Sequence, residues 1–424
     1  MNAVRFSREV AITTVPFLLV IMISTTVAAA DWVHLSGSEE GRASDGPALM
    51  GFFRVGGEQV FSNPVANLKS EGLSGYNGEN PSFNLISGTR VQRSFQLRNV
   101  RIGVRGSAPR SDRRVSYFML MEMGSGGLTL EDPVVVSDAT LTLSLSGLPK
   151  MRMGKMKTPG MDETLQSLPV ASDLADFSLV AGRLMQERDI SEGAYGGAVY
   201  GFRDVGLQLF DSYLLGKSEV SWAVMVGNGR AKWMDNDQAL DTWARLQYAF
   251  LPAGNRHKGT RDEVAAFVWF QRGERLLDTD RSHTRERAGA GFHYRSGALE
   301  LRTEAVVAKG VLFSGQAPAF PGNPLSILPD GEAFGGTLGA GYRVVPHVEL
   351  NLAGALVNQE PGKGAAERVF SEMVLGAQYI VSPSTRLMFN LKVRDFRAPA
   401  GSADAQTLLQ SVGPRLSLTL ITRL

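Results

Sequence analysis

Apolar and polar residues alternate along the last stretch of the chain. One face is apolar or neutral and the other is largely polar; the first carries Leu416, Leu418, Leu420, Thr422 and Leu424, and the second Arg415, Ser417, Thr419 and Arg423. Because successive side chains of a β-strand point to opposite faces of a sheet, this alternation predicts a strand between an apolar and an aqueous environment. It is typical of a membrane-spanning barrel strand and also of a half-buried strand in a soluble sandwich.

The same alternation recurs from about Met50 onward and predicts about sixteen strands, an even number as in single-chain outer-membrane barrels. The strands are predicted to begin near residues 50, 93, 115, 134, 150, 201, 218, 239, 262, 286, 298, 333, 346, 369, 385 and 412. Charges such as Asp241, Arg245 and Glu300 recur on the polar faces. A closed apolar core would exclude them unless they were paired, whereas a wet lumen tolerates them. The pattern therefore favours an all-β fold, a transmembrane antiparallel β-barrel.

The predicted connections fall into two length classes, according to whether the strand before them is odd- or even-numbered. Those after even-numbered strands are mostly tight, as at 147–149 and 382–384, whereas those after odd-numbered strands are mostly long, as at 62–92, 158–200, 310–332 and 398–411. Short turns at one end and long loops at the other are typical of outer-membrane barrels. Several even-numbered strands also end in aromatic residues on the predicted lipid face, which predicts an interfacial girdle of Phe210, Tyr248, Phe250, Phe292, Tyr294, Tyr342 and Tyr379.

The N-terminus has the pattern of an export signal. Arg5 and Arg8 precede an apolar run, 10–23, that is too short to span a bilayer comfortably, and three alanines at 28–30 offer a cleavage site. We therefore expect a cleaved signal peptide at 1–30, a short periplasmic segment at 31–49, and an outer-membrane barrel at 50–424 in a Gram-negative-type bacterium. No later run of about twenty apolar residues predicts a membrane helix.

Composition narrows the chemistry. The chain has 44 basic and 42 acidic residues, and its formal net charge of +2 gives no bulk reason to expect nucleic acid as a partner. It has no cysteine, which excludes disulfides, thiolate metal sites and cysteine-linked haem. No cofactor is expected. The 47 glycines suit a turn-rich β protein.

Five short motifs follow one another between Phe95 and about Tyr248. They are Arg98 to Gly106, Met153 to Pro159 followed by Glu163, Arg203 to Leu209, Gly227 to Gly229, and Asp235 to Asp237 leading to Arg245. In this order and spacing they resemble the phosphate-selective porin O and P family, and the rest of the chain fits by pattern only. The resemblance implies a homotrimer of sixteen-stranded barrels. The chain departs from the family at Gly160 and Met161, where Phe-Gly is common, and at Leu424, where an aromatic residue is usual.

In porins of this kind the third outer loop, here 158–200, folds inward and narrows the lumen. Candidate anion contacts are Arg98, Arg101, Arg105, Arg152, Lys155, Lys157, Arg183 and Arg188, and the opposing acidic candidates are Asp162, Glu163 and Asp189. A constriction with both signs of charge orients solutes, and basic groups favour anions. We expect a passive channel for small hydrophilic solutes with weak to moderate anion preference. Any one basic residue could instead pair with an acid such as Glu122, and alternation alone does not reveal the basic ladder that phosphate selectivity needs.

Two other classes of function, an enzyme and a structural sheath, are alternatives to a channel. The five histidines are isolated from one another, and no metalloprotease, nucleophile-elbow or phosphate-loop motif occurs, so no enzyme is expected. The second class is a structural barrel sheath around a haem-protein partner, as in a porin-cytochrome conduit. A sheath needs a lumen that the third loop does not obstruct, whereas a porin conducts ions alone.

Overall fold

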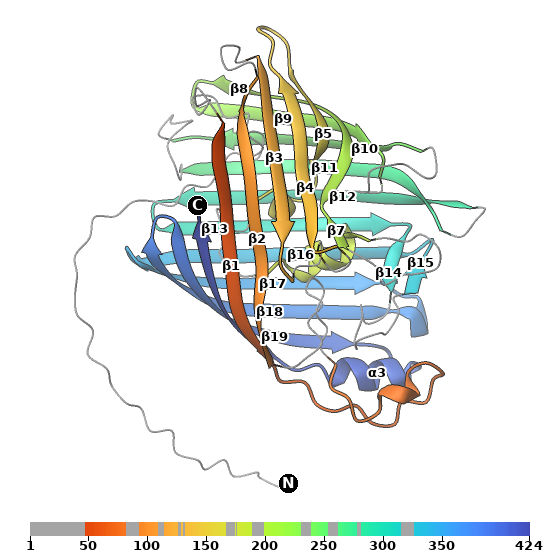
Figure 1. The fold of residues 1–424 in the computed structure, drawn as a ribbon. Coiled ribbons are helices and arrows are strands. Elements are labelled where there is room, and N and C mark those ends of the chain that lie inside the picture. Colours follow the sequence, from red (N-terminus) through yellow and green to blue (C-terminus); the bar gives the residue numbers. More distant parts are fainter. Residues whose placement is uncertain are drawn as a thin grey trace, which may run out of the picture.

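Sixteen strands form one closed antiparallel barrel (Figure 1). The computed structural model describes residues 47–81, 93–108, 114–125, 129, 132–166, 174, 176–188, 199–229, 239–252, 262–277, 281–314 and 326–424. The expected signal peptide lies outside this part of the chain and stays a prediction.

The barrel strands follow one another around the ring in chain order, and β1 pairs with β20 to close it. Their bounds are Ala48–Val60 (β1), Arg93–Ser107 (β2), Val115–Met123 (β3), Val134–Leu143 (β4), Lys150–Lys157 (β5), Arg203–Leu215 (β8), Ser218–Gly227 (β9), Asp241–Phe250 (β10), Glu263–Leu276 (β11), Ser282–Ser296 (β12), Leu299–Lys309 (β13), Glu332–Val345 (β16), Val348–Gln359 (β17), Arg368–Ser382 (β18), Thr385–Arg397 (β19) and Arg415–Arg423 (β20). The predicted fold class and strand number are confirmed, and each strand begins within a few residues of its predicted start.

Side chains on β20 separate as the alternation predicted. Leu418 and Leu420 are 48% and 43% exposed on the outer face, whereas Ser417 and Thr419 are 3% and 0% exposed on the lumen face. The apolar groups therefore face outward, and the polar groups face the lumen.

A β-bulge breaks the alternation on β2. Arg54 on β1 pairs with Asn99 and Val55 pairs with Leu97, so Arg98 has no partner across the ladder. One extra residue in a strand lets two successive side chains turn to the same side. Arg98 and Asn99 are both buried on the lumen side, on the same face as Arg101.

One aromatic residue of the predicted girdle was wrongly placed. Phe210 is 1% exposed and faces the lumen, where the Arg152 guanidinium lies 4.4 Å from its ring centroid. On β8 the even-numbered residues face inward, as buried Gln208 and Ser212 show, and a stacked guanidinium stabilises a ring at such a position. The predicted girdle residues exposed on the outer face are Tyr248, Phe250, Phe292, Tyr342 and Tyr379.

Short elements lie in the connections. They are η1 (Ser74–Tyr76), α1 (Asp162–Leu165), the π-helical turn η3 (Ala181–Met185), β6 (Glu187–Arg188), β7 (Val199–Gly201), β14 (Leu312–Ser314), β15 (Ser326–Leu328), η5 (Gly364–Ala366) and α3 (Ala403–Gln410). Two connections depart from the parity pattern, because 251–262 is long at the turn end and 277–281 is short at the loop end. Among the described residues, no helix is both long and apolar enough to cross a bilayer.

A buried apolar cluster fills part of the barrel interior toward the loop end. It joins the third loop to inward-facing wall residues and to the first and last loops; its members include Val65, Leu68, Leu179, Val180, Leu184, Trp269, Val306, Val357, Phe370, Phe396, Leu408 and Leu409. The first loop and α3 lie side by side in Figure 1, and the Asp404 carboxylate accepts the backbone N–H groups of Lys69 and Ser70. This part of the lumen is therefore packed like a protein core.

The outward face generates a stability prediction. Leu246 lies mid-strand on β10 with 51% exposure, and Leu240 lies just before the same strand with 60% exposure. Leu246→Arg should lower the free energy of unfolding by about 2–4 kcal/mol, because a guanidinium near the bilayer midplane loses hydration. Leu240→Arg, the matched control near the interface, should cost about 1 kcal/mol or less. Urea unfolding in lipid vesicles measures both, and equal costs would contradict the assigned lipid-facing band.

Candidate functional site

The third loop connects β5 to β8, and its described parts, 158–166, 174, 176–188 and 199–202, contact opposite sides of the barrel interior. Its Asp176 contacts β1, β2 and β20, whereas its Glu187 contacts β11 and β12. These strands lie far apart around the ring, so the loop spans the lumen instead of following one wall. The predicted inward-folded third loop is therefore present, with α1 and η3 inside the barrel (Figure 1).

Asp176 is surrounded by arginines of the wall. Its Oδ1 lies 2.8 Å from Arg54 Nη2 and 2.6 Å from Arg98 Nη1, and its Oδ2 lies 3.4 Å from Arg415 Nη2. Arg98 and Arg415 also pair with Glu58. Burial alone would raise the pKa of Asp176, but the surrounding cations outweigh it and hold that pKa well below its usual value. The carboxylate therefore stays charged and ties the loop to the basic wall.

The same wall continues toward the turn end. Arg101 Nη2 lies 2.6 Å from Glu122 Oε2, and Asn99 donates to the other oxygen of that carboxylate at 2.5 Å. Arg105 lies four residues further along β2, opposite Phe118, and is partly exposed. Arg98, Arg101 and Arg105, which the sequence singled out, therefore line one side of the lumen.

A second basic group borders the start of the third loop. Arg203 Nε lies 3.0 Å from Asp138 Oδ2, and Lys157 donates to the carbonyls of Leu165 and Gln166 at 2.9 and 2.8 Å. Lys155 is also buried. Arg152 lies nearer the turn end, where it donates to Gln208 at 3.2 Å. Lys157 thus supports the loop backbone, whereas Arg152 belongs to the wall.

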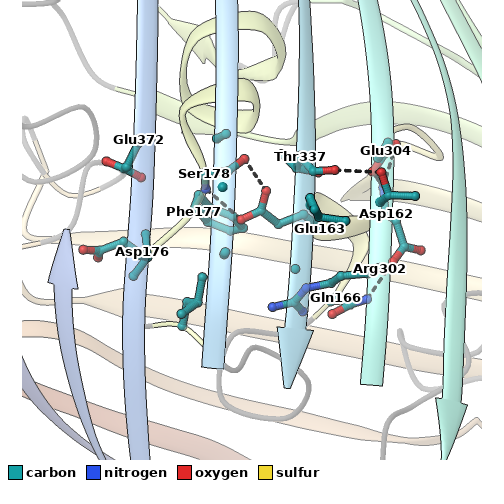
Figure 2. Close-up of a pocket in the computed structure, with 18 of the residues that line it drawn as sticks. Asp162, Glu163, Gln166, Asp176, Phe177, Ser178, Arg302, Glu304, Thr337 and Glu372 are labelled. Carbon is teal, nitrogen blue, oxygen red and sulfur yellow. Dashed lines mark hydrogen bonds between the residues drawn. The ribbon is translucent and has the colours of Figure 1, made fainter. Parts of the chain in front are cut away.

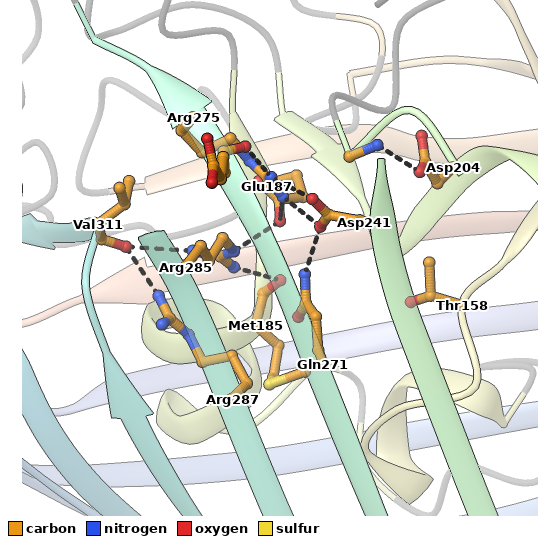
Figure 3. Close-up of polar contacts among 12 residues, drawn as sticks. Thr158, Met185, Glu187, Asp204, Asp241, Gln271, Arg275, Arg285, Arg287 and Val311 are labelled. Carbon is orange, nitrogen blue, oxygen red and sulfur yellow. Dashed lines mark hydrogen bonds and ion pairs between the residues drawn. The ribbon is translucent and has the colours of Figure 1, made fainter. Parts of the chain in front are cut away.

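Opposite the Asp176 cluster, Glu187 fixes a second point of the loop (Figure 3). Its Oε1 lies 2.8 Å from Arg275 Nη2 and 2.7 Å from Arg285 Nε, and Arg275 also binds Asp241 at 2.7 Å. Arg287 donates to the carbonyls of Leu184 and Val311 at 2.8 and 2.7 Å. Burial alone would raise the pKa of Glu187, but the cations Arg275 and Arg285 outweigh it and lower that pKa. Buried arginines therefore hold the loop at two points on opposite sides of the barrel, Asp176 and Glu187.

The first turn of the loop lies against β10, β11 and β13. Asp162 Oδ1 accepts from Arg245 Nη2 at 2.8 Å, and the Asp162 N–H donates to Glu304, whose Oε1 accepts from Trp269 Nε1 at 2.6 Å. Glu163 instead accepts from the N–H and hydroxyl of Ser178 at 2.7 and 2.5 Å. Burial raises the pKa of the Glu163 carboxyl, and these two hydrogen bonds offset part of that rise. Asp162 and Glu163 thus both lie on the part of the third loop inside the barrel, in different environments.

Of the predicted site residues, Arg183 does not face the lumen passage, and the side chains of Arg188 and Asp189 lie outside the described part of the chain. Arg183 faces the wall, where its Nη2 donates to Gln359 at 2.8 Å and its guanidinium stacks 3.6 Å from the Phe370 ring centroid. It lies there because the wall offers an amide and an aromatic face. Arg188 lies in β6, but its side chain is outside the described part, as is all of Asp189.

Sequence reasoning missed the residues that hold the loop. Arg54, Glu58 and Arg415 come from the first and last strands, and Arg275 and Glu187 come from β11 and the loop. Alternation along the strands can place Arg54, Glu58, Arg275 and Arg415 on the lumen face. Which residues they pair with depends on the path of the loop, which alternation does not give. Within the described residues no group of acidic or histidine side chains could hold a metal ion.

The Asp176 cluster generates a second prediction. Asp176→Asn should lower the free energy of unfolding by about 3–5 kcal/mol at pH 7, because it leaves buried guanidinium charges without their carboxylate. The wild-type stabilisation should be complete above the unfolded carboxyl pKa near 3.9 and be lost as the pH falls through the lower folded pKa.

Asp395→Asn is the control, because Asp395 pairs with Arg397 at the exposed surface, where solvent screens the ion pair and its loss costs little stability. Urea titration in lipid vesicles at several pH values compares the two variants. Equal stabilities would show that Asp176 does not hold the loop.

The chain resembles known proteins in fold and not in sequence. No known family profile matches it, and no curated protein matches it in sequence. Solved structures do match. The anion-selective porin of Comamonas acidovorans has 13% identity and a TM-score of 0.56, over 89% of this chain and 99% of that one. OmpF of Salmonella typhi in complex with daunomycin has 10% identity and a TM-score of 0.57, over 90% and 98%. OprB of Pseudomonas putida has 10% identity and a TM-score of 0.54, over 95% and 99%. The chain therefore shares the barrel fold of outer-membrane porins.

Proposed function

We propose that this protein is an outer-membrane porin, a passive channel for small hydrophilic solutes that favours anions weakly to moderately. The carrying observation is the third loop across the lumen, facing a wall lined by Arg54, Arg98, Arg101, Arg105 and Arg415. A loop that narrows a charged lumen sets both the size and the sign of the solutes that pass. The loop covers part of this lining, since Arg54 and Arg245 are 5% and 2% exposed where they pair with Asp176 and Asp162.

The wall arginines favour a general preference over a phosphate-specific site. A phosphate site needs several donors that converge on one anion. Here the donors of Arg54, Arg98 and Arg415 converge on the Asp176 carboxylate, and Arg101 is bound to Glu122. Attraction of anions then comes from the field of the whole wall, and phosphate specificity has no separate support.

The sheath reading is disfavoured by the same loop. A haem protein threaded through the barrel would collide with the third loop and the apolar cluster beneath it. We also propose that residues 1–30 are removed on export, from the N-terminal sequence pattern, and that the barrel assembles as a homotrimer in outer-membrane lipid, as the family resemblance implies. Enzymatic activity is not part of the proposal.

Reversal potential in a salt gradient tests the selectivity. Arg105 is suited to substitution because it is partly exposed in the lumen and lies on the turn side of the Asp176 cluster. Arg105→Glu should move the reversal potential of the channel in a planar bilayer toward cation preference. The shift should be largest at low ionic strength, where the Debye length is about 10 Å or more.

Arg272→Gln is the control. The Arg272 side chain is 66% exposed on the outer face of β11, whereas Gln271 and Arg275 of the same strand face the lumen. It should leave the reversal potential unchanged. A folded Arg105→Glu channel with wild-type ion preference would contradict the role of this wall. If the wild-type protein does not conduct on its own and co-purifies with a haem protein, that result would support the structural sheath function instead.

A further inference from the structure

The connection after β13 packs against the third loop at the loop end of the barrel. Its described stem begins with a strap, residues 310–314, which contains β14, and returns through β15 and residues 329–331. Leu312 of the strap is fully buried in the apolar cluster that also contains Val180 and Leu184 of the third loop, and β14 contacts η3. The strap therefore forms one packed unit with the third loop.

Two arginines of β12 join the strap to the third loop. Arg287 donates through Nε to the carbonyl of Leu184 at 2.8 Å and through Nη2 to the carbonyl of Val311 at 2.7 Å. Arg285 repeats the bridge, with Nη1 3.2 Å from the Val311 oxygen and Nη2 3.3 Å from the Leu184 oxygen. Figure 3 shows both guanidinium groups between Val311 and the third loop. Each arginine thus holds one carbonyl of the strap and one of η3.

A second wall strand, β17, connects the same two segments. The Gln359 side chain donates through Nε2 to the carbonyl of Phe313 at 3.0 Å, and its Oε1 accepts from Arg183 of η3 at 2.8 Å. β12 and β17 thus bind different carbonyls of the strap, and each strand also binds η3. The position of η3 is therefore tied to the backbone of the strap through the barrel wall.

The strap backbone adopts an uncommon conformation where it makes these contacts. Gly310 has a φ of 67°, and a Cβ atom there would lie 1.7 Å from the carbonyl oxygen of Thr284, so only glycine fits. Val311 has a positive φ of 20°, which a β-branched residue keeps only where its surroundings hold it. The N–H groups of both residues donate at 2.8 Å, to the carbonyls of Gly331 and Pro329. The strap is therefore held by its contacts and not by local preference.

Arg287 holds the two segments by geometry. In the described part of the chain its guanidinium donates only to backbone carbonyls, those of Leu184, Glu286, Lys309, Gly310 and Val311. These acceptors carry no net charge, so the contact depends on the planar fork of N–H donors, which the ammonium of a lysine does not reproduce. Arg285 differs, because its Nε also pairs with Glu187 at 2.7 Å. Replacement of Arg287 by lysine therefore tests geometry separately from charge.

The third loop has room to move beside η3. A recess of about 790 Å³, including space open to solvent, lies between described parts of the loop and the wall (Figure 2). Ser178, shortly before η3, lines it from the loop, and Gly339, Ala353 and Ala355 line it from the wall. Because these wall side chains are small, packing holds the loop less firmly on this side than on the side of the strap.

We propose that Arg285 and Arg287 are positioning residues that latch the third loop to the strap, so that the conformation of the connection after β13 controls how firmly η3 is held in the channel. With the latch closed, η3 keeps its place when a voltage is applied. With the latch open, the membrane field acts on loop charges such as Arg183 and moves η3 into the passage. The proposal rests on the channel function above and adds the device that keeps the channel open.

Arg287→Lys opens the latch and keeps the charge. Hydrogen–deuterium exchange of the detergent-folded protein, read by mass spectrometry, should show the amides of residues 181–186 exchanging about tenfold faster than in wild type, because local opening sets their rate. In a planar bilayer the current through this variant should fall at a lower applied voltage than in wild type, whereas its reversal potential in a salt gradient should not change. Gly310→Ala should act in the same way from the side of the strap, without changing an arginine.

Arg295→Lys is the matched control. Arg295 lies on the same strand and is also buried, but its guanidinium binds Glu300 of β13 at 3.1 and 2.7 Å. This variant should exchange and close like wild type. The effects of Arg287→Lys and Gly310→Ala should not add when the two changes are combined, because both open one latch. Folded variants with wild-type exchange or wild-type closing voltage, or effects that add fully, would overturn the proposal.

The wild-type protein gives a test that needs no variant. The amides of residues 181–186 and those of the strap should show the same protection from exchange, because the latch releases both segments together. Clearly different protection of the two segments would overturn the latch.

The two proposals fail separately. A folded barrel that does not conduct contradicts the channel function, and exchange in detergent still measures the latch. A barrel that conducts but exchanges like wild type in both variants keeps the channel function and loses the latch.

Discussion

Pairing between acids of the third loop and arginines of the barrel wall holds the interior together. A buried charge without a partner costs several kcal/mol, and a loop inside a barrel must bring its polar groups with it. Asp176 meets Arg54, Arg98 and Arg415 on one side, and Glu187 meets Arg275 and Arg285 on the other. Because the two anchors lie on distant strands, the loop between them is stretched across the lumen.

The anchors alone would leave the loop backbone exposed to water on both sides. The apolar side of η3 instead packs on Trp269, Val357 and Phe370, and the first loop and α3 cover it from the loop end. Burial of this surface makes the loop part of a core, while the basic wall near β1 and β2 keeps a polar surface. The interior thus has an apolar half that closes the lumen and a charged half that borders the passage.

The same arrangement leaves a space between the third loop and the barrel wall. Where the wall carries bulky residues, as at Phe370 and Val357, the loop packs directly against it. Where the wall carries Gly339, Ala353 and Ala355, the described part of the loop leaves a space beside Glu163. Side-chain volume on the wall strands therefore decides where the loop packs directly against the wall and where a space remains.

The sequence by itself determined the barrel. Period-two alternation identified sixteen strands and the lumen faces of residues such as Asp241, Arg245 and Glu304, because strand geometry places side chains by sequence position alone. It also anticipated the inward third loop through a resemblance. Local pattern misplaced Phe210, whose ring stacks under a guanidinium from the neighbouring strand.

Only the tertiary structure decided which charges meet. The bulge at Arg98 turns it to the lumen beside Asn99, against simple alternation, and Arg183 turns to the wall because Gln359 and Phe370 come from strands far along the chain. The pairing of Asp176 with arginines of the first, second and last strands depends on closure of the ring, which brings the two ends of the barrel sequence together. Strand phase is a local property of the chain, whereas ion pairing across a lumen depends on distances that exist only once the barrel has closed.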